Sequence, residues 1–181
     1  MSSLKELTME EHKNAERQQF VMEIFRGTVD EKQYAEFLFN QHAIYDTLEA
    51  TAMMHGIFNN IPTIRRAPSI MEDYIELWGD NPPPEHKPST KKYMEHIFRI
   101  RDDVDKVMAH VYVRHMGDLS GGQILKKKVP GSGKLYQFEG DVTDLKDKIR
   151  SKTKDSMAEE AKVCFNFATQ LFKEMQDGQV K

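Results

Sequence analysis

Three polar residues near the N-terminus have the spacing of a metal ligand, its orienting partner and an anion holder. Glu16 follows His12 by four residues, and Lys5 precedes His12 by seven. If residues 4–17 are helical, the three side chains share one face, with Lys5 about 10 Å from His12 along the axis. A carboxylate one turn away can orient a metal-binding imidazole and raise its basicity. Taken alone, such a row is more typical of a solvent-facing end of an amphipathic helix.

A second feature is a glycine-rich stretch over residues 112–123, whose apolar spacing is otherwise helical. It contains Gly117, Gly121 and Gly122 together with an acid, Asp118. A glycine inside a helix costs about 1 kcal/mol relative to alanine, so the three cost roughly 3 kcal/mol. Such a cost indicates that backbone must lie where a side chain would not fit, at a bend or against another body. A flat ligand and a second helix both meet that requirement.

Other chemistry-bearing residues are less informative. Lys146 and Arg150 lie four apart and could converge on a carboxylate or phosphate, although such a run is usually a solvated face. None of the seven histidines follows a glutamate by three residues, as in di-iron bundles, and no two are four apart, as in zinc proteases. The single cysteine, Cys164, excludes a cysteine-rich metal site. The sequence therefore gives a zinc or di-iron site little support.

The composition is that of an ordinary globular domain. The chain has 181 residues, 39% of them hydrophobic and 30% charged, and a net charge of −3. This length suits one buried core, and the charge gives no sign of a nucleic-acid partner. No segment approaches the roughly 20 apolar residues that span a bilayer. We expect one soluble, intracellular domain over residues 1–181, with no membrane partner.

The elements that must position these residues are helices. Capping-box patterns occur at Ser3-x-x-Glu6, Thr28-x-x-Glu31, Ser69-x-x-Glu72 and Ser156-x-x-Glu159. Apolar spacing predicts helices near 4–17, 20–26, 30–57, 69–79, 89–101, 103–128, 142–154 and 157–176. No run of alternating residues favours a sheet, so we predict an all-α fold.

Three blocks of sequence together resemble the haem oxygenase family. The first is His12-Lys13-Asn14-Ala15-Glu16, the second Tyr112-x-Arg114-x-x-Gly117-Asp118-Leu119-Ser120-Gly121-Gly122-Gln123, and the third Glu159-Glu160-Ala161-Lys162-x-x-Phe165 with Leu171-Phe172. They occur in the family's order and cover nearly the whole chain. The resemblance implies a single-domain, multi-helix bundle in which haem is sandwiched between a proximal and a kinked distal helix.

The resemblance also implies roles for individual residues. His12 would be the axial iron ligand of haem b, Glu16 would orient its ring, and Gly117, Gly121 and Gly122 would form the distal helix over the haem. Asp118 would be the distal carboxylate that acts through ordered water. The remaining implied site residues are Lys5, Tyr112, Lys146 and Arg150 for the two propionates, Tyr45 and Arg114 for the distal polar network, and Phe165 and Phe172 for the pocket wall.

The implied reaction is oxidative opening of haem, which is both cofactor and substrate, to biliverdin IXα, carbon monoxide and ferrous iron. It consumes O2 and electrons, which we expect from reduced ferredoxin, and a bilin reductase could take the product. The implied protein is a monomer of the cytoplasm, of the plastid stroma if eukaryotic, or of the host cytoplasm if viral. The alternative is a haem-binding carrier of the same fold that does not degrade haem.

Two further expectations concern the surface and the departures from the family pattern. Lys126, Lys127, Lys128, Lys148, Lys152 and Lys154 could form a basic docking patch for an acidic electron donor, or simply a solubilising face. His115, Val113 and Ala168 stand where the family usually has tyrosine, threonine and asparagine. We expect these three residues to thin the distal hydrogen-bond network.

Overall fold

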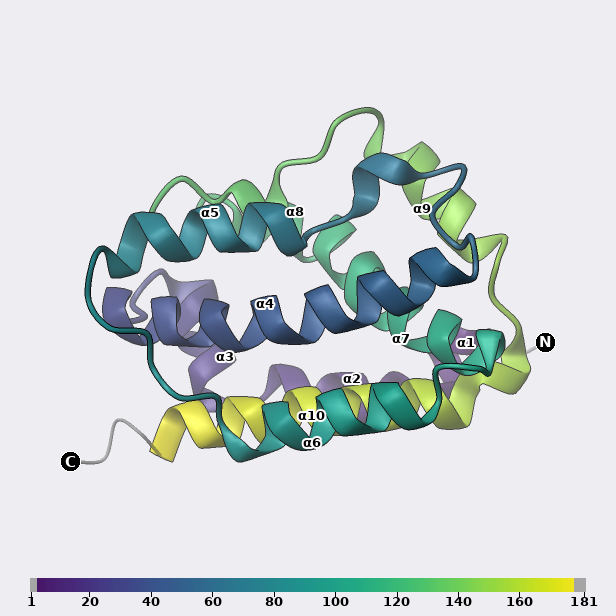
Figure 1. The fold of residues 1–181 in the computed structure, drawn as a ribbon, viewed down its shortest axis with the longest axis horizontal. Coiled ribbons are helices and arrows are strands. Elements are labelled where there is room, and N and C mark those ends of the chain that lie inside the picture. The colour runs from purple at the N-terminus through teal and green to yellow at the C-terminus, as the bar shows by residue number, and fades with distance from the viewer. Residues whose placement is uncertain (1–2, 178–181) are drawn as a thin grey trace.

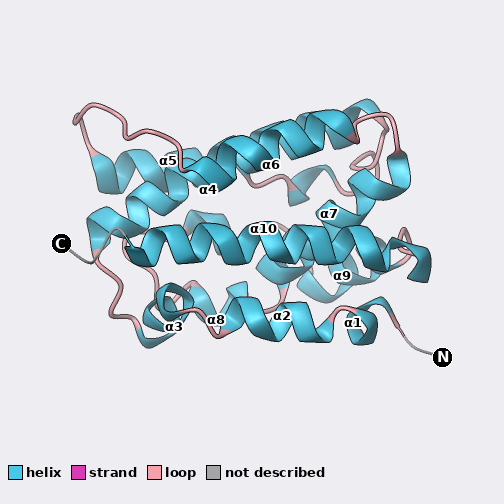
Figure 2. Cartoon of the chain, turned by 90° about the horizontal axis from the view of Figure 1, so that it is seen from below, coloured by secondary structure: helices cyan, strands magenta, loops and turns pink. Residues whose placement is uncertain are grey.

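Helices build the whole fold in the computed structural model, which describes residues 3–177 and contains no strand within that range (Figure 2). The longer α-helices are α2 (Met9–Glu16), α3 (Gln19–Arg26), α4 (Glu31–Met54), α5 (Ala67–Trp78), α6 (Pro88–Arg99), α7 (Val104–Leu119), α9 (Val142–Arg150) and α10 (Ala158–Asp177). The short elements are α1 (Leu4–Leu7), α8 (Gly122–Leu125) and the 3-10 helices η1 (Pro62–Ile64), η2 (Lys134–Tyr136) and η3 (Asp155–Met157). The all-α prediction is confirmed.

Two long helices organise the packing. Helix α4 packs against α5, α6 and α7, and α10 packs against α7, α6, α3 and α2, so Figure 1 shows α4 between α5 and α10. Leu38, Ile44 and Leu48 of α4 are almost completely buried and belong to the same core as Ile97 of α6 and Val111 of α7. Burial of such side chains contributes about 1.5–3 kcal/mol each, which fixes the helices that carry the site.

Two of the predicted helices are each divided into two shorter helices. The segment predicted as 4–17 divides at Thr8, whose side chain donates to the Leu4 carbonyl at 2.9 Å. The segment predicted as 103–128 divides at Ser120, where φ −96° and ψ −86° end α7 before α8 begins. This second break lies between Gly117 and Gly121, in agreement with the bend that the glycines in this helix indicated.

Local capping signals were only partly reliable. The capping box at Ser3 is confirmed, because the Ser3 hydroxyl accepts from the Glu6 amide at 3.2 Å and the Glu6 carboxylate accepts from the Ser3 amide at 3.3 Å. The predicted cap at Thr28 is wrong, since Asp30 caps α4 by accepting from the Gln33 amide at 3.0 Å. The predicted cap at Ser69 is also wrong, because Ser69 lies inside α5.

Helix α5 is capped from another helix. Its first amides, those of Arg66 and Ala67, donate to the carboxylate of Glu49 on α4 at 2.6 and 3.0 Å. A negative charge at a helix N-terminus is stabilising, and here it comes from a residue distant in sequence.

The fourth predicted cap, Ser156, lies inside η3, directly before α10. No helix within residues 3–177 is long and apolar enough to cross a bilayer.

Candidate functional site

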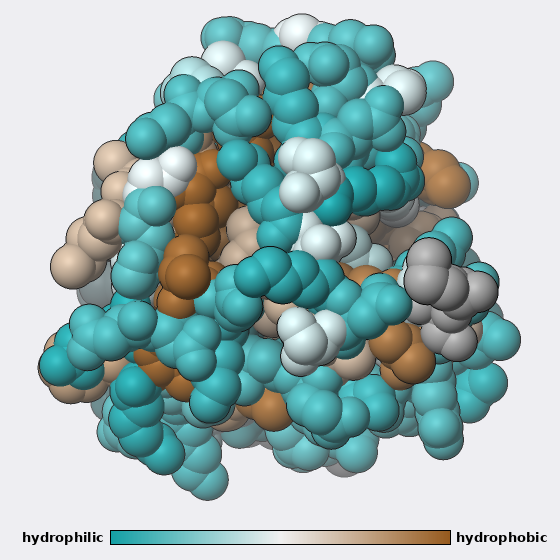
Figure 3. Space-filling view, turned by 90° about the vertical axis from the view of Figure 1, so that its right-hand side faces the viewer, coloured by the Kyte–Doolittle hydropathy of each residue, from teal (hydrophilic) through white to brown (hydrophobic). Residues whose placement is uncertain are grey.

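A cavity of about 600 Å³ is lined by residues of α1, α2, α3, α4, α7 and α10, with single residues from α8 and α9. Twelve of the predicted site residues line it, namely Lys5, His12, Glu16, Tyr45, Tyr112, Arg114, Gly117, Asp118, Gly121, Arg150, Phe165 and Phe172. Gly122 and Lys146 are not among its lining residues. Figure 3 shows the adjoining end of the molecule covered mainly by hydrophilic residues, with hydrophobic atoms visible between them. The folded chain therefore gathers residues from both ends of the sequence around one space.

His12 and Glu16 form the histidine–carboxylate pair that their spacing predicts. His12 Nε2 lies 2.6 Å from Glu16 Oε1, and the two side chains are 40% and 55% exposed. The imidazole also stacks on Phe165 of α10, with ring centroids 5.2 Å apart and planes inclined by 17°. One ring nitrogen is thus held by the carboxylate while the other can act as a metal ligand.

Gly117 and Gly121 leave space on the cavity side rather than making room for another part of the chain. A Cβ at Gly117 would meet no atom within 4 Å, and one at Gly121 would meet only the Gly117 carbonyl oxygen at 3.8 Å. Neither residue has a positive φ, so backbone conformation does not require glycine here. A bulky body that approaches the helix backbone from the cavity gives both glycines a reason.

Gly122 makes room for another part of the chain. A Cβ at this position would lie 2.5 Å from Cδ1 of the Tyr136 ring, so Gly122 permits close packing of α8 on η2. Tyr136 itself lines the cavity, although sequence reasoning did not identify it. Nothing in the local sequence around Tyr136 signals this contact, because it depends on where η2 crosses α8.

Asp118 is the buried acid of the site. Its side chain accepts a hydrogen bond from the Tyr45 hydroxyl at 2.7 Å, and the residue is 8% exposed. Burial raises the pKa of Asp118 to about 6, although His115, the Tyr45 hydrogen bond, Arg66 and Arg114 all act to lower it. A carboxyl group with this pKa can take up and release a proton near neutral pH.

Arg114 contributes a buried donor to the same wall. Its Nε donates to the Tyr93 hydroxyl at 3.2 Å and its Nη1 to Gln41 Oε1 at 3.3 Å. Its Nη2 is buried and has no hydrogen-bond partner among the described residues. Because an unsatisfied buried donor is costly, this nitrogen favours a polar ligand or ordered water in the cavity.

Cationic and phenolic groups gather at one part of the lining. Lys5, Tyr112 and Arg150 all line the cavity, and Arg150 is close enough to lower the pKa of Tyr112, which burial raises. Arg150 is also paired with Asp147 at 3.1 Å. Lys146, one turn earlier on α9, remains a predicted anion-binding residue outside the lining. These groups suit carboxylates on a bound molecule.

His115 makes a contact that the sequence did not reveal. It is fully buried between the rings of Tyr45 and Phe58, and its Nε2 lies 2.8 Å from Glu49 Oε2. His115 therefore connects α7 to the carboxylate that caps α5, and it adds a hydrogen bond where we expected the network to thin. The other two departures, Val113 and Ala168, both line the cavity without a polar side chain.

Comparisons with known proteins place these features in a family. The family model described as Heme oxygenase matches residues 1–174. Heme oxygenase of Pyropia yezoensis is 30% identical over 212 residues, covering 99% of this chain and 87% of the relative. Heme oxygenase 2 of Mus musculus is 29% identical over 201 residues, and this chain spans 95% of its own length but only 64% of that relative.

Solved structures agree with the sequence comparison. Heme oxygenase-1 of the cyanobacterium Synechocystis sp. PCC6803, solved in complex with heme, superposes with a TM-score of 0.86 at 24% identity, covering 97% of this chain and 91% of that one. The structure of heme oxygenase from Leptospira interrogans gives a TM-score of 0.85 at 29% identity, covering 94% of this chain and 97% of the other.

Proposed function

The chain belongs to the haem oxygenase family, and from this premise we propose that it binds haem b in the cavity and cleaves it to biliverdin IXα, carbon monoxide and ferrous iron. The observation that carries the proposal is the set of residues that line one cavity. A histidine–carboxylate pair, two glycines with open space before them and a buried acid with a pKa of about 6 all line it. Side-chain packing alone does not explain why the histidine–carboxylate pair, the two glycines and the buried acid occur together.

The residues present fit haem. When bound, haem supplies the iron at which O2 is activated, so it is both cofactor and substrate. His12 is the ligand that we assign to the iron, and Glu16 holds the imidazole in orientation through the 2.6 Å contact. Phe165 and Phe172 give the apolar wall that a macrocycle requires, and Gly117 and Gly121 let backbone approach its face.

Polar residues then set orientation and proton supply. Lys5, Tyr112, Lys146 and Arg150 are the groups that we assign to the propionates, and the propionate contacts would fix which edge of the macrocycle is offered for cleavage. Asp118 Oδ2 shares a hydrogen bond with the Tyr45 hydroxyl, so these two atoms can hold a proton at the cavity wall. Arg114 Nη2 supplies a further donor.

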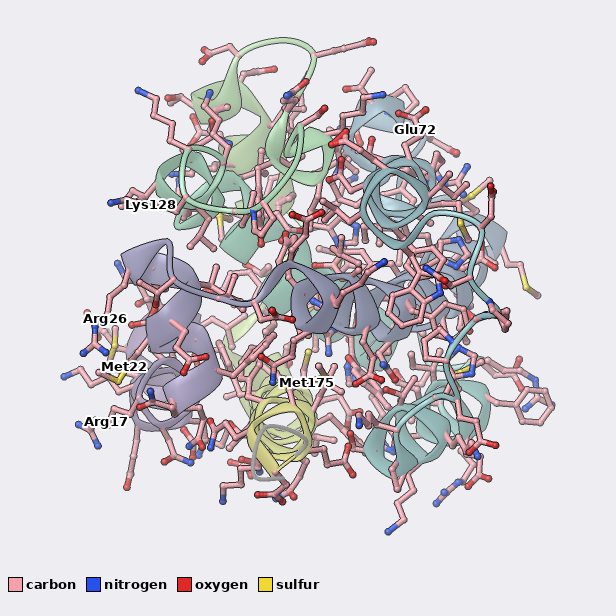
Figure 4. The ribbon with its side chains drawn as sticks, turned by 90° about the vertical axis from the view of Figure 1, so that its left-hand side faces the viewer. Arg17, Met22, Arg26, Glu72, Lys128 and Met175 are labelled. Carbon is pink, nitrogen blue, oxygen red and sulfur yellow. The ribbon has the colours of Figure 1, made fainter. Side chains whose placement is uncertain are left out.

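For the electron donor we propose reduced ferredoxin, and a basic face supports this choice. Lys126, Lys127 and Lys128 are exposed after α8, and Figure 4 shows Lys128 along the same side of the molecule as Arg17 and Arg26. Helices α3 and α8, which bring Arg26 and the lysines together, are in contact.

The other half of the predicted basic patch is largely neutralised. Lys148 pairs with Asp144 at 3.0 Å and Lys154 with Asp105 at 3.2 Å. The docking face is therefore better defined by Arg17, Arg26, Lys126, Lys127 and Lys128. Turnover with ferredoxin should slow as salt is raised, and a salt-independent rate would count against this face.

We further propose that the protein acts as a monomer in the cytoplasm, the plastid stroma or a host cytoplasm, and that a bilin reductase takes the product.

The direct test is turnover of the haem-loaded protein. Purified protein is mixed with hemin, ferredoxin, ferredoxin reductase and NADPH in air, and the visible spectrum is followed. We expect the Soret band to disappear, a broad red biliverdin band to grow, and chromatography to identify the IXα isomer. A histidine-ligated haem spectrum that never decays would instead indicate the carrier. If Asp118→Ala formed product at the parent rate, the role that we assign to Asp118 in proton supply would be wrong.

A further inference from the structure

A second histidine–carboxylate cluster lies among three helices behind the cavity wall. His96 of α6, His110 of α7 and Glu160 of α10 bring their ligating atoms within 4.8 Å of one another. Both His96 Nε2 and His110 Nε2 point to a single oxygen, Glu160 Oε1, at 2.6 and 2.8 Å. The pairs are separated by 64 and 50 residues in sequence, so no local spacing predicts the group.

The burial of the cluster suits a small ion. The His110 side chain is 0% exposed, Glu160 is 12% exposed and His96 is 21% exposed. Two ligands are therefore held by the protein interior, while His96 leaves one side accessible from solvent. The ligating atoms of the three residues lie within 4.8 Å of one another, which is close enough for one ion to contact all three.

The second nitrogen of His110 has the partner that a metal-bound imidazole usually has. His110 Nδ1 lies 2.7 Å from the Tyr93 hydroxyl, which is fully buried with it. Metal-binding histidines generally donate their other N–H to an oxygen, and the Tyr93 hydroxyl can accept from Nδ1 in the tautomer whose Nε2 carries the lone pair. An ion pair that only stabilised the fold would require the contacts of His96 and His110 with Glu160, but it would not require the contact between His110 Nδ1 and Tyr93.

We propose that His96, His110 and Glu160 form a binding site for a divalent first-row transition cation such as Zn²⁺. Two imidazole nitrogens and one carboxylate oxygen are a ligand set that suits zinc and its neighbours, whereas Mg²⁺ and Ca²⁺ prefer oxygen ligands alone. Because the His96 side chain is 21% exposed, a water molecule could supply the fourth ligand from that side.

The site has a connection to the cavity. The Tyr93 hydroxyl accepts from Arg114 Nε at 3.2 Å and lies 3.1 Å from Cys164 Sγ, and both Arg114 and Cys164 line the cavity. A cation that fixes the His110 tautomer makes Nδ1 a donor to Tyr93, so the phenol proton must turn toward another acceptor. Cation binding should therefore alter the environment of Arg114 as well as that of the cluster.

The test uses the haem-free chain without a histidine tag. Zn²⁺ is titrated by calorimetry, and Co²⁺ is used as a visible probe whose d–d absorption reports low-coordinate nitrogen and oxygen ligation. We expect one equivalent of either ion, no competition by Mg²⁺, and a loss of affinity of at least roughly tenfold in His96→Asn and in Glu160→Gln. His96 is the preferred variant because it is the most exposed ligand.

The matched control is His12→Asn, which removes the other histidine–carboxylate pair. It should keep the Zn²⁺ stoichiometry and the Co²⁺ spectrum, whereas His96→Asn should keep normal hemin binding. The proposal is overturned if the parent chain binds no stoichiometric Zn²⁺ in the micromolar range, or if His96→Asn binds as tightly as the parent. It is also overturned if His12→Asn abolishes the binding, which would locate the ion in the cavity.

Discussion

The two histidine–carboxylate groups of this protein are built in different ways. His12 and Glu16 come from one turn of one helix, and both are substantially exposed at the cavity. His96, His110 and Glu160 come from three helices and are largely buried. The first group lines a cavity of about 600 Å³, whereas the second is packed between three helices. Local spacing can therefore predict the first group, whereas only tertiary packing creates the second.

The largest effect is expected from filling the cavity at Gly121. Gly121→Leu should reduce hemin turnover at least 100-fold, because its side chain would project into the space that the backbone leaves open. Zn²⁺ binding at the second group should be unchanged. Gly122→Ala is the contrast, since its Cβ would meet Tyr136 and should destabilise the fold by about 1–3 kcal/mol. Normal turnover by Gly121→Leu would show that haem lies elsewhere.

The next effect separates the two groups by their contribution to stability. His110→Ala should lower the free energy of unfolding by about 3 kcal/mol, because it empties a fully buried position and removes one hydrogen bond each from Tyr93 and Glu160. His12→Ala should change it by no more than about 0.5 kcal/mol, since its side chain is 40% exposed. Urea denaturation of the haem-free variants measures both. Equal losses would remove the distinction drawn between the groups.

A third prediction concerns the pH dependence of stability. The pKa of Asp118 is raised from 3.8 to about 6, so the folded state holds this proton more tightly than the unfolded chain. Stability should therefore fall as pH rises through this window, by no more than about 3 kcal/mol from this group. Asp118→Asn should remove that loss, so its stability relative to the parent should increase from pH 4 to pH 7. A constant difference across the window would contradict the raised pKa.

The smallest effect is expected at Glu16. Glu16→Gln keeps the size of the side chain but removes its charge, so the imidazole should be oriented less well and be less basic. Turnover should fall roughly tenfold with haem still bound, and the iron–histidine stretching frequency should decrease. Glu10→Gln, an exposed substitution on the same helix, is the control. Equal behaviour of the two variants would exclude an orienting role for Glu16.

The sequence predicts those parts of the molecule that depend on neighbouring residues. The helical content, the cap at Ser3 and the His12–Glu16 pair all follow from spacings of three or four residues, and each is found in the structure. The cost of the glycines correctly indicated an interrupted helix, and the open space beside Gly117 is a finding of the structure.

What the sequence does not predict is made by contacts between distant segments. Glu49 reads as an ordinary mid-helix glutamate, yet it caps α5 and binds His115. Gly122 reads as a third glycine of the distal helix, yet its lack of a side chain serves the ring of Tyr136. These roles depend on how the helices pack, and the spacing of residues within one helix carries no information about that packing.

The central claim is that haem binds at His12, and a hemin titration tests it most directly. Hemin is added to the parent chain, His12→Ala and His96→Asn, and the visible and electron paramagnetic resonance spectra are recorded. The account predicts one equivalent of histidine-ligated haem in the parent and in His96→Asn, and loss of that ligation in His12→Ala. An unchanged histidine-ligated spectrum in His12→Ala would contradict it.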